Sequence, residues 1–193
     1  MLHRFTPLFA AALFVISSAA TALAGQVTIK GTHLCCGACQ TRAEKALAGI
    51  PGLTKASVDR NSKVISFVAA NTKAVTAGIA SLAKSGFYGA AIHEKTPVQF
   101  PATGAKKNVR GETHTLRGMH LCCDACVVGA QKAVETVKGL QAIEIDRKVR
   151  TVKLIGKEIS LAEAIRALQK AGFYAHVRVP KKPKSPKSPK KKK

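Results

Sequence analysis

The chain carries two copies of one module, and this internal repeat constrains its fold more than any other feature. Residues 27–94 and 114–179 match, at a constant offset of 87 positions as far as Arg60 and Arg147, as tandem structural repeats do. The matching pairs outside the cysteine motif include Gly31/Gly118, Ala43/Ala130, Lys45/Lys132, Gly52/Gly139, Asp59/Asp146 and Arg60/Arg147. After the loss of one residue, Gly86-Phe87-Tyr88 recurs as Gly172-Phe173-Tyr174. A fold that serves one copy must therefore serve the other.

The pattern within each copy predicts the element order β-α-β-β-α-β. Alternating polarity indicates strands, and apolar residues at helical spacing indicate helices. The strands are expected at 27–30, 55–60, 63–68 and 88–93, then at 114–121, 141–147, 150–155 and 174–179. The helices are expected at 38–48, 72–84, 125–137 and 161–171. This order is that of the split βαβ, or ferredoxin-like, sandwich. The sequence thus predicts the α+β class, with two tandem sandwiches.

All six cysteines lie in two loops, one in each copy, between the first strand and the first helix. The loops read His33-Leu34-Cys35-Cys36-Gly37-Ala38-Cys39 and His120-Leu121-Cys122-Cys123-Asp124-Ala125-Cys126. A disulfide within a loop would close only a few residues and would stabilise the fold little. Thiols at the start of a helix are favoured as thiolates, and thiolates select soft or borderline metal ions.

The two loops resemble the metal-binding loop of heavy-metal-associated domains. That family carries Gly-Met-x-Cys-x-x-Cys, and Cys36, Cys39, Cys123 and Cys126 fall on its two cysteines. It includes copper chaperones, the repeats of copper-transporting ATPases and a periplasmic mercury-binding protein. The resemblance implies a ferredoxin-like fold and metal handling. Leu34 and Leu121 fall on the methionine that packs beneath the loop in the family.

The loops also depart from the family pattern, and the departures widen the ligand set. Cys35 and Cys122 add a third thiol to each loop and are candidate third ligands. His33 and His120 replace the family glycine and are either further ligands or ordinary residues at a strand end. We expect Cu(I) first, then Zn(II) because three sulfurs and one nitrogen suit it, and Hg(II) or Cd(II) third. Up to one ion is expected per module, and the expected partner is a metal donor or acceptor protein.

Two other functions fit the same residues. The cysteines could cycle between thiol and disulfide. Alternatively, the modules could be spacers in a structural protein that the lysine-rich residues 180–193 hold to an anionic surface. No Gly-rich phosphate loop and no paired base and nucleophile stand out in the sequence, so we do not expect an enzyme.

The N-terminal residues 1–24 are expected to be a secretory signal peptide. Arg4 precedes an apolar run, Leu8–Ile16, and Ala22-Leu23-Ala24 matches a cleavage site. The mature protein, beginning near Gly25, is then expected to be secreted or periplasmic.

The remaining segments complete the expected organisation. Residues 25–94 and 114–179 are the two domains, and 95–113 is a linker that leaves their relative orientation open. Residues 180–193, rich in lysine and proline, are expected to form a disordered tail. The chain has 32 Lys and Arg against 10 Asp and Glu, so an anionic lipid or cell-surface polymer is a candidate partner of the tail. Nucleic acid is not expected as a partner, because we expect the chain to be exported.

Overall fold

The computed structural model describes residues 24–177, so the expected signal peptide and the lysine-rich tail lie outside the described residues. The first module is built from β1 (Gly25–Lys30), α1 (Gly37–Leu47), β2 (Leu53–Asp59), β3 (Val64–Ala69), α2 (Thr72–Lys84) and β4 (Ala90–His93). The second is built from β6 (Arg110–Arg117), α3 (Asp124–Val134), β7 (Leu140–Asp146), β8 (Thr151–Ser160) and α4 (Leu161–Lys170). The predicted element order is confirmed through the last helix of each copy.

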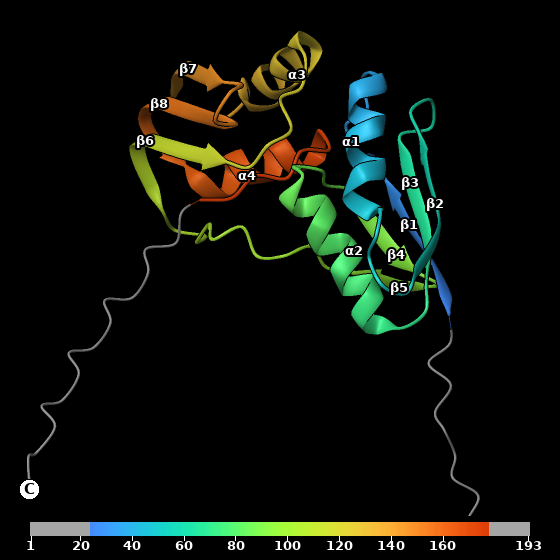
Figure 1. Ribbon diagram of the computed structural model, residues 1–193. Coiled ribbons are helices and arrows are strands. Elements are labelled where there is room, and N and C mark those ends of the chain that lie inside the picture. Colours follow the sequence, from blue (N-terminus) through green and yellow to red (C-terminus); the bar gives the residue numbers. More distant parts are fainter. Residues whose placement is uncertain (1–23, 178–193) are drawn as a thin grey trace, which may run out of the picture.

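The first sheet has the strand order β2-β3-β1-β4-β5 and is antiparallel at every pairing. Its four central strands have the arrangement of a ferredoxin-like sandwich. The fifth strand, β5 (Thr96–Val98), comes from the segment expected to be a linker and pairs with β4. Figure 1 shows α1 and α2 together on one face of this sheet.

The second sheet has the order β6-β8-β7 and lacks a regular fourth strand among the described residues. A single bridge between Arg117 and His176 takes its place. The strand predicted at 174–179 is thus reduced to this bridge within the described part, because the next N–H, that of Val177, donates to the carbonyl of Thr103 instead. Strand β8 is longer than predicted, since Arg110 at the start of β6 pairs with Ser160. The predicted fold class, two tandem ferredoxin-like modules, is confirmed.

Alternating burial explains why the strands form where they do. In β1, Val27 and Ile29 face the helices and are buried, while the residues between them are more exposed. In α4, Leu161, Ile165 and Leu168 make the matching buried stripe at helical spacing. Side chains also cap two helices, as N-cap residues do: Asn71 accepts from the N–H of Ala74 at the start of α2, and Ser160 accepts from the N–H of Glu163 at the start of α4.

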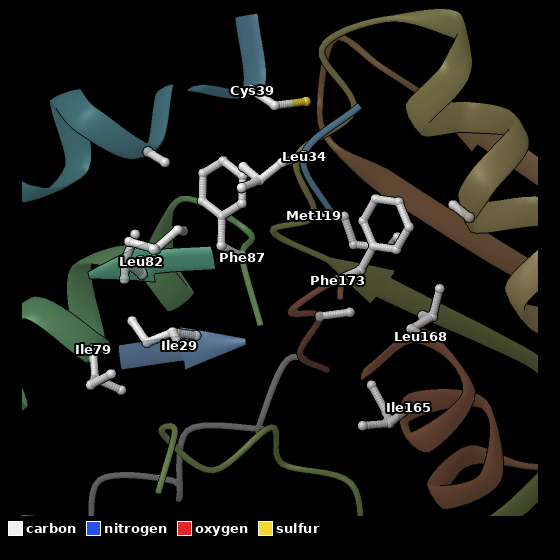
Figure 2. Close-up of a cluster of buried hydrophobic side chains, with 14 of the residues drawn as sticks. Ile29, Leu34, Cys39, Ile79, Leu82, Phe87, Met119, Ile165, Leu168 and Phe173 are labelled. Carbon is white, nitrogen blue, oxygen red and sulfur yellow. The ribbon is translucent and has the colours of Figure 1, made fainter. Parts of the chain in front are cut away.

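The two modules share one continuous hydrophobic core. Phe87 and Phe173 are almost fully buried where the modules meet, together with Met119 and both loop leucines, Leu34 and Leu121. Figure 2 shows the two phenylalanines between the inner residues of one module, such as Leu82, and those of the other, such as Leu168. The orientation that the sequence left open is therefore set by apolar burial at this junction. Among the described residues, no helix is long and apolar enough to cross a membrane.

Candidate metal centre

The junction brings the two cysteine loops face to face. Helices α1 and α3 begin directly after Cys36 and Cys123, which are the N-cap residues and have extended backbone conformations. The partial positive charges of the two helix N-termini therefore act on the same group of sulfurs.

The six sulfur atoms form one cluster. Within a module, the Sγ of Cys39 lies 3.5 Å from that of Cys35 and 3.6 Å from that of Cys36. Across the junction the separations are as short: 3.3 Å from Cys39 to Cys122 and 3.4 Å from Cys35 to Cys126. All six cysteines are free thiols. The structure thus brings together, in one place, every cysteine that the sequence nominated as a ligand.

The cluster is buried at its centre and open on one side. Cys39 and Cys126 are buried, while Cys36, Cys122 and Cys123 are half-buried. Cys35 is exposed. A metal ion or the thiol of a partner protein can therefore reach the cluster from the side of Cys35.

His33 and His120 lie next to the cysteines and close to each other. Their ring centroids are 5.5 Å apart, and a ring nitrogen of each lies within 4.8 Å of the other and of the Cys126 sulfur. The Nε2 atoms of both rings are buried and have no hydrogen-bond partner. Because buried polar atoms are nearly always paired, these orphaned nitrogens beside six thiols fit a site that a soft metal ion completes.

The thiols have unlike acidities, which follow from their mutual hydrogen bonds. The Cys126 thiol, donating to Cys39 against the effect of burial, holds the pKa of Cys39 far below its usual range. The same hydrogen bond, with burial, raises the pKa of Cys126. Burial and the adjacent Cys39 raise the pKa of Cys122 to about 12. One thiolate is thus stabilised at the centre of the cluster before any metal binds.

Cys123 is the second acidic thiol. Burial opposes its ionisation, but hydrogen bonds from the Cys126 backbone N–H and from the Cys35 thiol lower its pKa to about 7. A low pKa is expected for a thiol at a helix N-terminus. The cluster therefore offers a thiolate from each loop near neutral pH.

The glycine and phenylalanine of the recurring Gly-Phe-Tyr triplets hold the two loops together. The carbonyl of Gly172 accepts from the N–H of His33 at 3.3 Å, and the carbonyl of Gly86 accepts from the His120 Nδ1 at 2.7 Å. Phe173 stacks on the His33 ring, and Phe87 stacks on the His120 ring, each with centroids 4.2 Å apart. Each module therefore positions the histidine of the other.

Two arginines with a role at the site were not singled out as functional by the sequence. Arg147 forms an ion pair with Asp124 at 2.7 Å and donates to the Cys122 carbonyl at 3.0 Å, so it fixes the second cysteine loop. Arg150 spans the junction, donating to the carbonyls of Met119, at 2.9 Å, and Lys84, at 3.2 Å. The carboxylate of Asp146, which precedes Arg147, accepts from the N–H of Lys148 at 2.8 Å and stabilises the turn after β7. The recurrence of Asp-Arg in both copies of the module was the sequence signal that could have indicated a role for Arg147.

The buried position of His33 predicts a pH-dependent stability of the reduced, metal-free protein. Burial, then the neighbouring His120 and Lys63, lower the His33 pKa to about 4, with Cys39 opposing. An unfolded histidine has a pKa of about 6.5. Between these values only the unfolded chain binds the proton, so the free energy of unfolding should fall as pH drops from about 6.5 to 4. Urea unfolding at a series of pH values measures this. His33→Gln should flatten the slope; an unchanged slope in His33→Gln would contradict the assignment.

Comparisons with solved structures found partial similarities at low sequence identity. Oxidized MerP from Ralstonia metallidurans CH34 is 23% identical, over 35% of this chain and 96% of that chain, with a TM-score of 0.32. The N-terminal soluble domains of Bacillus subtilis CopA are 20% identical, over 81% of this chain and 96% of that chain, with a TM-score of 0.28. A structure described as crosstalk between Cu(I) and Zn(II) homeostasis is 20% identical, over 35% of this chain, with a TM-score of 0.33. No family model matches the sequence, and no curated protein matches it.

The strand order and the cysteine loops define the class of protein. The chain has the fold of two tandem ferredoxin-like modules, each with cysteines at the N-terminus of its first helix. In these features it resembles heavy-metal-associated domains. In this chain the two cysteine loops lie together, and their six thiols form one cluster that could hold metal.

Proposed function

We propose that this chain is an exported metal-binding protein that holds soft ions, Cu(I) before Zn(II), in its cysteine cluster. The observation that carries the proposal is the convergence of six free thiols, from two loops, at two helix N-termini. Cys36, Cys39, Cys123 and Cys126 are the proposed principal ligands, Cys35 and Cys122 supply additional thiolates, and His33 and His120 flank them. Thiolate sulfur prefers such ions over hard ones such as Mg²⁺.

The protein would store or transfer its metal by ligand exchange and would not act as an enzyme. A partner's thiolate adds to an ion that has fewer than four ligands, and the protein's own thiolates then leave one at a time. Cys35 is the exposed cysteine, so it is the first that a metal donor or acceptor protein would reach. The surplus of thiols within the cluster keeps the ion coordinated during each step.

Export and surface attachment are parts of this proposal that rest on segments outside the described residues. The apolar N-terminal segment would direct the chain to the periplasm or the exterior. The lysine-rich tail would hold the protein near an anionic lipid or cell-surface polymer. Both would place the metal centre where metal enters the cell.

Metal analysis of the purified chain tests the function. Prepared without oxygen and with reductant, the protein should retain copper or zinc, measured by elemental analysis together with free thiols. The double variant Cys36→Ser, Cys123→Ser should lose most of the metal. An unchanged circular dichroism spectrum would show that the fold persists. Recovery of the wild-type chain without metal, and without uptake of added Cu(I) or Zn(II), would refute the proposal.

Thiol–disulfide exchange is the second candidate function, and one observation favours it. The Sγ atoms of Cys39 and Cys122 are 3.3 Å apart, so a small movement would allow a disulfide between the modules. A chain that binds no metal but forms this bridge reversibly with a glutathione buffer would be a redox protein.

A further inference from the structure

We propose that the six thiolates form a single polynuclear centre with four trigonal positions for Cu(I), in place of one mononuclear site per module. This inference rests on the proposed function, since it specifies how many ions the cluster holds and how they share ligands. It is argued from the positions of the sulfur atoms alone.

The six sulfurs are arranged as a distorted octahedron. Ten sulfur–sulfur separations fall between 3.3 and 4.0 Å. Six sulfurs make fifteen pairs, and three of the five remaining pairs use each cysteine once, so we assign them as the three diagonals of the octahedron. These diagonals are Cys35 with Cys122, Cys36 with Cys126, and Cys39 with Cys123. Two of the three diagonals join cysteines that occupy different positions in the repeated motif. The octahedral arrangement therefore results from the docking of the two modules.

Three sulfurs that lie within 4.8 Å of one another can bind one ion, and among the triplets of the cluster that meet this condition, four together use every cysteine twice. The triplets are Cys35/Cys39/Cys126, Cys35/Cys36/Cys123, Cys36/Cys39/Cys122 and Cys122/Cys123/Cys126. Every cysteine occurs in two of them, and any two triplets share one cysteine. These are alternate faces of the octahedron. Four ions on these faces, bridged by six thiolates, form a closed M₄S₆ cage in which no sulfur is left over.

The edge lengths fit a trigonal thiolate site. A metal–sulfur bond of about 2.3 Å, the length found for zinc thiolates, places three sulfurs around one ion about 4 Å apart. The observed separations reach this value with a slight expansion of the cluster. Zn(II) takes four ligands in a closed site, and because only two histidines, His33 and His120, lie beside the cluster, at least two of four Zn(II) ions on three-sulfur faces would lack a fourth protein ligand. Cu(I), a soft ion that thiolates select, is therefore the ion that we assign to the cage.

The charge of the filled cage suits its place in the fold. Six thiols and four Cu⁺ ions give a cage of charge −2 and release six protons to solvent. Two helices, α1 and α3, direct their N-termini at this anion, and helix N-termini stabilise negative charge. A single ion held by two thiolates would leave the remaining four thiols of the cluster without a metal ion.

Titration of the full chain with Cu(I), supplied as its acetonitrile complex without oxygen, tests the inference. Native mass spectrometry should show cooperative filling to four Cu per chain, and X-ray absorption should show three sulfurs per copper with copper neighbours. Saturation at one or two Cu per chain, with two sulfurs each, would overturn the cage and leave the proposed function intact. Absence of copper binding would overturn both.

Replacing Cys35 and Cys122 further distinguishes the polynuclear cage from one mononuclear site per module. In the cage, Cys35 and Cys122 each bridge two ions, so the double variant Cys35→Ser, Cys122→Ser should fall from four Cu per chain to two or fewer. The exposed Val128 on α3 provides the matched control, and Val128→Ser should still bind four. If the double variant keeps the wild-type stoichiometry, the cage is refuted, with circular dichroism confirming that the variant is folded.

Discussion

Alanine in place of Gly172 is expected to break the docking of the two modules. Gly172 has φ +84, and a Cβ there would lie 2.2 Å from the His33 backbone nitrogen and 2.6 Å from the Gly31 carbonyl oxygen. Both atoms belong to the backbone of the other module and cannot move aside as a side chain would. The left-handed conformation costs an alanine about 1–2 kcal/mol, and overpacking adds about 1–3 kcal/mol. We expect the junction to open and the six thiols to separate.

Small-angle scattering and Cu(I) stoichiometry measure this outcome. The radius of gyration of Gly172→Ala should rise, and copper bound per chain should fall. Gly49→Ala is the matched control, because Gly49 also has a positive φ, +72, but a Cβ there meets nothing within 4 Å. Gly49→Ala should be destabilised only by the left-handed backbone conformation and should keep the metal centre. A Gly172→Ala chain as compact as wild type, with the same copper content, would show that the modules are held by other contacts.

Truncation of Phe173 to alanine is the second change for which a large effect is expected. The side chain is fully buried and stacks on His33 at 4.2 Å and on His120 at 4.9 Å. Loss of a buried phenylalanine costs about 3–5 kcal/mol through lost burial and the cavity left behind. The midpoint of urea unfolding of the metal-free protein should therefore drop strongly. Phe100→Ala should cost less, because Phe100 is only partly buried.

A double-mutant cycle shows whether this cost belongs to the junction. Phe87 and Phe173 lie in different modules, but their backbones form an antiparallel β-bridge with each other. If the modules are docked, Phe87→Ala and Phe173→Ala should be coupled by about 0.5–3 kcal/mol, whereas independent modules would give additive effects. Additivity would mean that each phenylalanine fills only the core of its own module.

The docked arrangement explains how the departures from the family loop work together. An extra cysteine in a single module adds one thiol to a site of two. Where two such loops face each other, Cys35 and Cys122 each reach sulfurs of the opposite loop, at 3.4 Å to Cys123 and 3.3 Å to Cys39. The histidines that replace glycine stack on phenylalanines of the other module. The same residues that enlarge the ligand set therefore also build the junction.

Much of the fold could be predicted because it depends on local pattern. The bounds of α2, Thr72–Lys84, agree with prediction, since an Asn cap and a clear apolar stripe mark it. The differences arise where pairing is long-range: β5 formed in the expected linker because β4 offered an edge. Residues 174–177 pair through one bridge and then bond to Thr103. Pairing of this kind depends on what lies alongside a segment, which its own sequence does not show.

By itself the sequence determined the repeat, the order of elements in each module and the identity of the candidate ligands, because periodicity and motif spacing are local properties. Whether those cysteines lie in two places or in one was decided only by the tertiary structure. The physical reason is the junction: burial of Phe87 and Phe173, with glycine at positions 86 and 172 where no Cβ fits, turns two cysteine loops far apart in the chain toward a single point.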